Sequence, residues 1–349
     1  MKHFIPPWWL PGRHLQTLWQ PLFRDRPVPA TRRERLLTPD RDFIDMDWFE
    51  PCPEGPLVVL LHGLSGSSRS PYIRGMQVAL AAKGFRTVAL NFRGCSGEPN
   101  HSALGYHSGE TSDLSFLIQQ LRRREPQTPF LAIGYSLGGN VLLKWLGETG
   151  STADIEAAVA VSVPLRLDLC ATHLDQGWSR VYRNRLLQEL KEYVAGKLAR
   201  LEVLGLEEEA QKLRALGDLR PIKTFWDYDA RVVGGLYGFE SAQAYYDASS
   251  SRRYLLGIRR PTRIVHALDD PFMTPEVLPE AHELSPLVEM VLSDSGGHVG
   301  FVDGGFPWSP GYWLERMVPD YFRRVLSPST PTLAPQSLPD PGVHQSPLV

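Results

Sequence analysis

Residues 130–140 read Phe-Leu-Ala-Ile-Gly-Tyr-Ser-Leu-Gly-Gly-Asn, a short apolar run that leads into the pattern G-x-S-x-G. Apolar residues with helical spacing follow it: Val141, Leu142, Trp145 and Leu146. This order predicts a strand, a sharp turn and a helix, with Ser136 at the tip of the turn. Gly134 and Gly138 lack a Cβ atom, so the strand and the helix can approach each other closely. The alternative is a glycine-rich turn whose serine only caps the helix.

Strand and helix patterns alternate on both sides of this stretch. Strands are expected at 32–37, 43–49, 57–61, 86–90, 155–163, 262–267 and 287–292, and helices at 71–83, 111–124, 275–284 and 311–326. Because most of these strands alternate with helices, they predict a mostly parallel sheet covered by helices on both faces. In 43–49, Asp45 and Asp47 alternate with apolar residues, which predicts a half-exposed strand rather than a calcium site.

Composition divides the chain into four parts. Residues 1–30 form an aromatic N-terminal arm, and residues 31–164 together with 255–326 form the α/β core. Residues 165–254 carry leucines at helical spacing and no buried-strand pattern, which predicts a helical cap inserted into the core. Glycines at 196, 205 and 217 argue against long helices there, and four aromatic residues are candidates to line an apolar pocket: Tyr237, Phe239, Tyr245 and Tyr246. The proline-rich tail, 327–349, is expected to be disordered.

The bulk composition excludes several classes of function. A net charge of −2 gives no electrostatic support for binding nucleic acid or an anionic membrane. The histidines and cysteines show neither H-E-x-x-H nor C-x-x-C spacing, so neither a metal site nor a cofactor is expected. No apolar run is long enough to span a membrane, and Pro6 and Pro7 interrupt the apolar start of the chain. Three scattered cysteines suggest reduced thiols, so we expect a cytoplasmic protein; the sequence carries no signal for an oligomeric state.

The aromatic arm allows two interpretations. Its tryptophan and phenylalanine rings, interrupted by prolines, are expected to pack against the core. The alternative is an arm that touches a lipid interface, because tryptophan favours that zone.

A serine hydroxyl needs a base within hydrogen-bond reach, and the base needs an acid that orients it. In this topology both are expected after the serine, at the carboxyl ends of later strands. His298 follows the last predicted strand in a glycine-rich loop, and Asp269 and Asp270 follow the strand before it. We prefer Asp269 because it leaves the strand first, whereas Asp270 precedes Pro271 and is a candidate to shape the turn.

A tetrahedral intermediate also needs donors for its oxyanion. The backbone N–H of Leu137 directly follows the predicted nucleophile, and the N–H of Leu64 lies in the loop after an early strand. His62 and His107 are interpreted as structural, because both precede the serine in the chain.

Several stretches together resemble the α/β-hydrolase superfamily and, more narrowly, its YheT-like branch of predicted esterases. They are His62-Gly63, 134–140, 269–272, 296–301, Pro11-Gly12-Arg13-His14-Leu15-Gln16-Thr17, 91–94 and 106–111. The resemblance covers about residues 4–325. It implies the α/β-hydrolase fold, no cofactor, and a carboxylic-ester hydrolase acting on short- or medium-chain acyl esters or acylglycerols. Carried over by position, its catalytic triad is Ser136, Asp269 and His298.

The leading hypothesis is therefore a serine esterase that acts on a small-molecule or lipid ester. An acyltransferase using the same triad is one alternative, in which an alcohol or thiol replaces water. A non-catalytic binding protein on this fold is another, because a fold does not determine a function.

Overall fold

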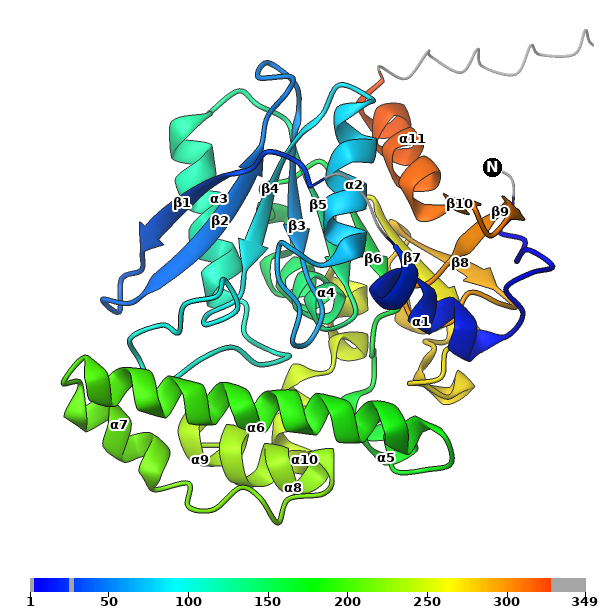
Figure 1. Cartoon of the computed structure of the whole chain (residues 1–349). Coiled ribbons are helices and arrows are strands. Elements are labelled where there is room, and N and C mark those ends of the chain that lie inside the picture. The colour runs from blue at the N-terminus through cyan, green and yellow to red at the C-terminus, as the bar shows by residue number, and fades with distance from the viewer. Residues whose placement is uncertain (1–2, 25–27, 328–349) are drawn as a thin grey trace, which may run out of the picture.

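A central sheet runs through the molecule. The computed structural model describes residues 3–24 and 28–327. Within them, eight strands pair in the order β1-β2-β4-β3-β5-β6-β7-β8 (Figure 1). The strands are β1 (Arg32–Leu37), β2 (Phe43–Phe49), β3 (Leu57–Leu61), β4 (Arg86–Asn91), β5 (Phe130–Tyr135), β6 (Ala157–Val161), β7 (Thr262–Ala267) and β8 (Val288–Ser293). Strands β3 to β8 are parallel, and β1 and β2 add an antiparallel edge, which confirms the predicted mostly parallel sheet.

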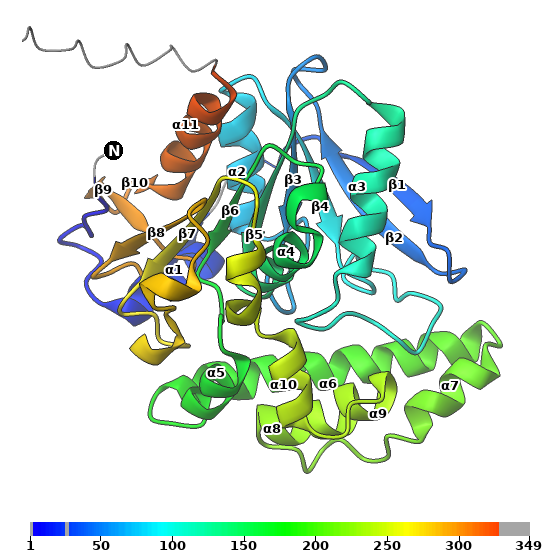
Figure 2. The same ribbon diagram turned by 180° about the vertical axis from the view of Figure 1, so that it is seen from behind.

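Helices cover both faces of this sheet (Figures 1 and 2). On one face lie α2 (Pro71–Ala81) and α11 (Leu314–Leu326); on the other lie α3 (Ser112–Arg124) and α4 (Leu137–Thr149). The fully buried strand β3 shows why this layering forms. Val58 and Leu60 pack with the first helix pair, whereas Leu57, Val59 and Leu61 pack with the second. Successive side chains point to opposite faces of a strand, so an uninterrupted apolar run needs a helix layer on each side.

A group of helices lies across one end of the sheet (Figure 1). It consists of α5 (Leu167–Leu174), α6 (Ser179–Val203), α7 (Glu207–Arg214), α8 (Phe225–Tyr228), α9 (Gly234–Tyr237) and α10 (Ala242–Ser249), with a π-helical turn at Asp229–Val233. We call this group the cap. The expectation of short helices was wrong for α6, which runs for 25 residues through Gly196. A single glycine weakens a helix by only about 1 kcal/mol, and the buried Leu187, Leu190 and Leu201 on the inner face of α6 offset that.

Two other expectations need correction. Strand β2 is buried along almost its whole length rather than half-exposed, because Asp45 and Asp47 pair with Arg35 and Arg33 of β1. The expected helix at 275–284 is instead two short 3₁₀ turns, Pro275–Val277 and Ala281–Glu283. Further 3₁₀ turns lie at Gly150–Thr152 and Ser251–Gly257.

A hairpin that the sequence did not suggest follows β8. It is formed by β9 (Val302–Phe306) and β10 (Ser309–Tyr312). The N-terminal arm contains α1 (Arg13–Phe23) and packs on this hairpin through the indole N–H groups of Trp8 and Trp9, which donate to Gly305 and Gly304. Among residues 3–24 and 28–327, no helix is both long and apolar enough to cross a membrane. Apart from Ser327, the predicted disordered tail lies outside the described residues.

Candidate active site

Ser136 occupies a strained turn between β5 and α4. Its backbone has φ 51° and ψ −119°, a region that side-chain-bearing residues rarely adopt, and its N–H donates to the Val161 carbonyl over 2.8 Å. The turn requires glycine on either side. A Cβ atom on Gly134 would lie 2.4 Å from the Gly138 carbonyl oxygen, and one on Gly138 would lie 2.4 Å from that of His62. The local sequence therefore folds so that the serine hydroxyl projects beyond the end of the sheet.

The His298 side chain connects Ser136 to a carboxylate. Its Nε2 lies 2.9 Å from Ser136 Oγ, and its Nδ1 lies 2.8 Å from Asp270 Oδ2. The Asp270 side chain is 1% exposed and that of His298 is 10% exposed, so water screens the pair only weakly. The structure thus brings together a serine, a histidine and an aspartate from three loops at the carboxyl ends of strands.

The choice of Asp269 as the partner of His298 was wrong. Asp269 instead accepts a hydrogen bond from the Gly297 backbone N–H over 2.9 Å, and burial raises the pKa of its carboxyl group. The reason is the turn after β7, in which the Asp270 N–H donates back to the Ala267 carbonyl oxygen. This turn reverses the chain, so the second aspartate, rather than the first, points back towards the histidine. The Phe272 N–H then fixes the Asp270 carboxylate by donating to Oδ1 over 2.9 Å.

Neighbouring groups set the orientation of the His298 ring. The Phe272 ring stacks on it with centroids 4.1 Å apart and planes 8° apart. The Val299 N–H donates to Ser162 Oγ, and the His298 N–H donates to Thr17 Oγ1 over 2.9 Å. Stacking therefore fixes one face of the His298 imidazole, and two hydroxyl groups fix the backbone that carries it.

Helix α1 binds residues 298–302, which we call the histidine loop, through buried amide side chains. Gln16 exchanges two hydrogen bonds with the backbone of Val302, each 2.9 Å long. Gln20 donates to the carbonyl oxygens of Val299 and Gly300. The sequence analysis missed this role of the arm. A signal was present, because Gln16 and Gln20 are four residues apart and so share one helix face.

The loop after β3 passes directly beside Ser136. A Cβ atom on Gly63 would lie 3.2 Å from the Ser136 Cβ. The amides on either side of Leu64 each donate to a tyrosine hydroxyl: Gly63 N–H to Tyr72 over 2.9 Å and Ser65 N–H to Tyr106 over 3.0 Å. The predicted oxyanion donors are the backbone N–H groups of Leu64 and Leu137, and both residues line the cavity in front of Ser136.

His62 and His107, the two other histidines considered in the sequence analysis, are buried and hydrogen-bonded. His62 Nε2 accepts the Phe92 N–H over 3.1 Å, and burial lowers its pKa to about 4. His107 Nδ1 accepts the Gly109 N–H, and burial lowers its pKa to about 4 as well. Both rings are therefore neutral near pH 7. In the described part of the chain, no group of three or more His, Cys, Asp and Glu side chains is arranged to hold a metal ion.

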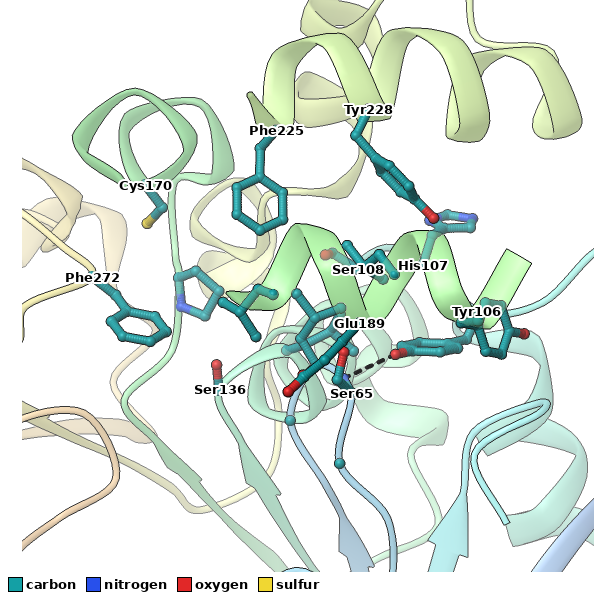
Figure 3. A pocket seen from close by; sticks show the side chains of 18 of the residues that line it. Ser65, Tyr106, His107, Ser108, Ser136, Cys170, Glu189, Phe225, Tyr228 and Phe272 are labelled. Carbon is teal, nitrogen blue, oxygen red and sulfur yellow. Dashed lines mark hydrogen bonds between the residues drawn. The ribbon is translucent and has the colours of Figure 1, made fainter. Parts of the chain in front are cut away.

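A cavity of about 430 Å³ lies between Ser136 and the cap (Figure 3). In Figure 3, Ser136 and Phe272 lie on one side of it, while Phe225 and Tyr228 approach from the cap. Apolar side chains dominate the cap wall: Leu167, Ala171, Leu174, Leu190, Val194, Leu213, Val232, Val233 and Leu236. Of the aromatic residues predicted to line a pocket, Tyr237, Tyr245 and Tyr246 do so, whereas Phe239 packs on Tyr245.

Ionisable groups also line the cap side of this cavity, Asp229 and Lys197 among them. Tyr246 donates to Asp229 over 2.7 Å, and burial raises the pKa of the Asp229 carboxyl group to about 7. Lys197 donates to the Leu104 carbonyl oxygen over 2.8 Å, and burial lowers the pKa of its ammonium group to about 7.

The fold agrees with comparisons to known proteins. Residues 56–305 match the family model described as the alpha/beta hydrolase fold. The chain therefore belongs to the α/β-hydrolase fold family, as the resemblance implied.

Individual relatives indicate which kinds of α/β-hydrolase the chain is similar to. The chain is 39% identical over 327 residues to the Escherichia coli (strain K12) protein named "Putative esterase YheT", covering 93% of this chain and 94% of that one. It is 30% identical over 285 residues to a Saccharomyces cerevisiae protein named monoacylglycerol lipase, covering 81% of this chain and 61% of that one. The solved structure of the Pyrococcus furiosus esterase Pf2001 aligns with a TM-score of 0.53 at 18% identity, covering 93% and 97% of the two chains, which supports the fold alone. These esterase and lipase relatives support a hydrolase.

Proposed function

We propose that this protein is a serine carboxylesterase that hydrolyses short- or medium-chain acyl esters, acylglycerols among them, through an acyl-enzyme on Ser136. The observation that carries the proposal is the hydrogen-bonded chain from Ser136 through His298 to Asp270 at the edge of an apolar cavity.

The first step is attack of Ser136 Oγ on the ester carbonyl carbon. His298 Nε2 takes the serine proton and then donates it to the leaving alcohol oxygen, which leaves an acyl group on Ser136. Asp270 accepts a hydrogen bond from Nδ1, which keeps the imidazole in the required tautomer and stabilises the imidazolium. Water activated by the same histidine then releases the acid and regenerates the serine.

The oxyanion of the tetrahedral intermediate needs two donors, and the N–H groups of Leu64 and Leu137 are the candidates. Leu137 is the first residue of α4, so its N–H has no partner within the helix and points out of the helix N-terminus. Leu64 lies between two amides that tyrosine hydroxyls fix in place. Loss of one such donor typically costs roughly 3 to 4 kcal/mol in the transition state.

The cap wall supports an apolar acyl or alcohol group as substrate. Burial of each methylene contributes about 0.8 kcal/mol, so an apolar cavity favours chains long enough to fill it. The relation to a protein named monoacylglycerol lipase is consistent with glycerol esters as the substrate class.

The test is a series of acyl esters of increasing chain length, hydrolysed by the wild type and by Ser136→Ala. The variant is expected to lose activity by about 10⁴-fold or more while keeping its fold, and only the wild type should be labelled by a fluorophosphonate probe. Hydrolysis by Ser136→Ala at the wild-type rate would contradict the proposal. Absence of labelling in folded wild type would favour a binding protein instead.

Transfer of the acyl group to an added alcohol in preference to water would favour the acyltransferase alternative. It is measured by adding a primary alcohol to the same assay and quantifying the ester and the free acid formed.

A further inference from the structure

Helix α1 buries two glutamine side chains and exposes several of its apolar side chains. Gln16 and Gln20 are 0% and 5% exposed, because their amides bind the backbone of the histidine loop. Leu15 and Leu22 are 48% and 58% exposed, and Phe23 at the end of the helix is 63% exposed. A surface helix normally turns its apolar stripe towards the core. The opposite arrangement leaves a stripe of exposed apolar residues along α1.

This stripe borders the opening of the active-site cavity. Leu15, Leu18 and Leu22 follow one another at intervals of three and four residues, so they share one face of α1. Leu18 lines the cavity. Pro21 of α1 and Arg185 of α6 also line the cavity, and both are exposed to solvent. The cavity therefore reaches the molecular surface between α1 and α6.

The start of α6 adds apolar residues on the other side of this opening. Trp178 is 78% exposed and Val181 is 58% exposed. The His14 ring of α1 stacks on the Tyr182 ring, with centroids 5.8 Å apart, and its Nδ1 lies 3.0 Å from the Tyr182 hydroxyl. These contacts bring the two helices together, and Figure 1 shows α1 next to the beginning of α6.

We propose that Leu15, Leu22, Phe23, Trp178 and Val181 form a docking face that binds a lipid surface presenting the ester substrate. The proposal rests on the proposed esterase function, because the face surrounds the entrance through which that substrate would pass. An exposed apolar surface of this kind next to a cavity marks an interaction site, and tryptophan and leucine are typical of faces that insert at a lipid interface.

The net charge of the chain is −2, but the local charge around the docking face favours an anionic lipid surface as the occupant. Arg13 at the start of α1 and Arg180 at the start of α6 are both exposed. Arg180 donates to the backbone carbonyl oxygen of Asp175, so its guanidinium lies close to the body of the cap. Cationic residues beside an apolar stripe attract anionic headgroups, and this attraction is screened by salt.

The test is co-sedimentation of the full chain with vesicles of phosphatidylcholine containing about one third phosphatidylglycerol, a mixture that supplies the negative surface potential. Wild type is expected to bind, and to bind more weakly as salt is raised. The double variant Leu15→Ser/Leu22→Ser is expected to bind at least about tenfold more weakly, because it removes two apolar side chains from the interface. The measurement needs no catalysis, so failure of docking and failure of the esterase proposal are distinguishable.

The control is Leu37→Ser/Val203→Ser, which removes two apolar side chains that are even more exposed, 75% and 79%, and lie away from the opening. It is expected to bind vesicles as the wild type does. Both double variants should retain the wild-type melting temperature and the wild-type rate on a water-soluble short-chain ester.

Three results would overturn the proposal. The first is no vesicle binding by the wild type, or equal loss in both double variants. The second is a wild-type dimer in solution that Leu15→Ser/Leu22→Ser dissociates, which would assign the face to a second copy of the chain. The third is wild-type vesicle binding that raised salt does not weaken, which would exclude anionic headgroups as the occupant.

Discussion

The core and the cap contribute two different kinds of surface to one cavity. On the core side, Ser136, His298 and Asp270 lie at the ends of parallel strands, and hydrogen bonds or ring stacking fix their positions. On the cap side, the wall consists mainly of aliphatic and aromatic side chains that pack by shape. Directional contacts specify where atoms react, whereas apolar packing specifies only size and shape. The difference suggests that the core determines the reaction and the cap determines which ester fits.

The largest effect is expected on the core side, at the two neighbouring aspartates. Asp270→Asn should lower kcat by about 10⁴-fold, because the amide cannot stabilise an imidazolium and favours the wrong tautomer. Asp269→Asn should change kcat by less than about tenfold, because asparagine can still accept the Gly297 N–H. Steady-state kinetics of both variants on one ester measures the difference. The reverse ranking would restore Asp269 as the acid.

A smaller core effect is expected at Tyr72 and Tyr106, which hold the loop after β3 that carries the proposed oxyanion donor Leu64. Tyr106→Phe and Tyr72→Phe each leave a backbone N–H without its acceptor, at a cost of about 1–3 kcal/mol. If the loop then loses its position, kcat should fall by roughly tenfold with little change in KM.

The matched control for this prediction is Tyr254→Phe, which removes a hydroxyl that donates to Ala248 in another part of the molecule. Its kcat should equal that of the wild type. A change in KM alone in Tyr106→Phe would indicate a role in substrate binding instead.

On the cap side, a substitution should change substrate preference rather than the chemical step. Ala171 of α5 lines the cavity and is 5% exposed. Ala171→Leu should lower kcat/KM for the longest accepted acyl chain by about tenfold, because the larger side chain occupies space that several methylenes would use. Hydrolysis of an acetyl ester should be unchanged. An equal fall for short and long chains would mean that the cap also positions the reacting groups.

The smallest effect concerns the stability of the cap. Burial raises the pKa of Asp229 from 3.8 to about 7, so the folded protein keeps a proton that the unfolded chain releases. The resulting stabilisation is complete below about pH 4 and is lost as the pH rises to about 7. Asp229→Asn should remove this dependence and be more stable than wild type at neutral pH, by on the order of 1–2 kcal/mol.

Denaturant unfolding of wild type and Asp229→Asn at pH 4.5 and pH 7.5 checks this prediction. Asparagine keeps an acceptor for the Tyr246 hydroxyl, so the comparison isolates the charge. An equal change in the free energy of unfolding of both proteins between pH 4.5 and pH 7.5 would contradict the prediction.

The sheet was predictable because its signal is local. The apolar run 57–61 coincides with β3, since a strand buried on both faces must be apolar at nearly every position. The G-x-S-x-G turn likewise requires glycines that the sequence displays. The pairing of the remaining strands was harder to predict from the sequence. The β9–β10 hairpin includes Gly304, Gly305 and Pro310, residues that argue against strands when only propensity is considered.

The acid and the role of the N-terminal arm could not be read from the sequence for a different reason. Which of two adjacent aspartates faces His298 depends on a turn of a few residues, and rotating that turn exchanges them. The contacts of Gln16 and Gln20 join residues 286 and 279 positions apart, and nothing local indicates the partner. Gly196 shows the converse case, because tertiary packing of α6 overrides its local preference.

The connection between α1 and the histidine loop has a consequence for synthesis of the protein. The ribosome releases α1 before Ser136 and His298 after it, and the loop that carries His298 has its final contacts only once Gln16, Thr17 and Gln20 bind it. A nascent chain that already contains Ser136 therefore lacks an oriented base. The Ser136 hydroxyl gains its hydrogen-bond partner only when residues 298–302 have docked on α1.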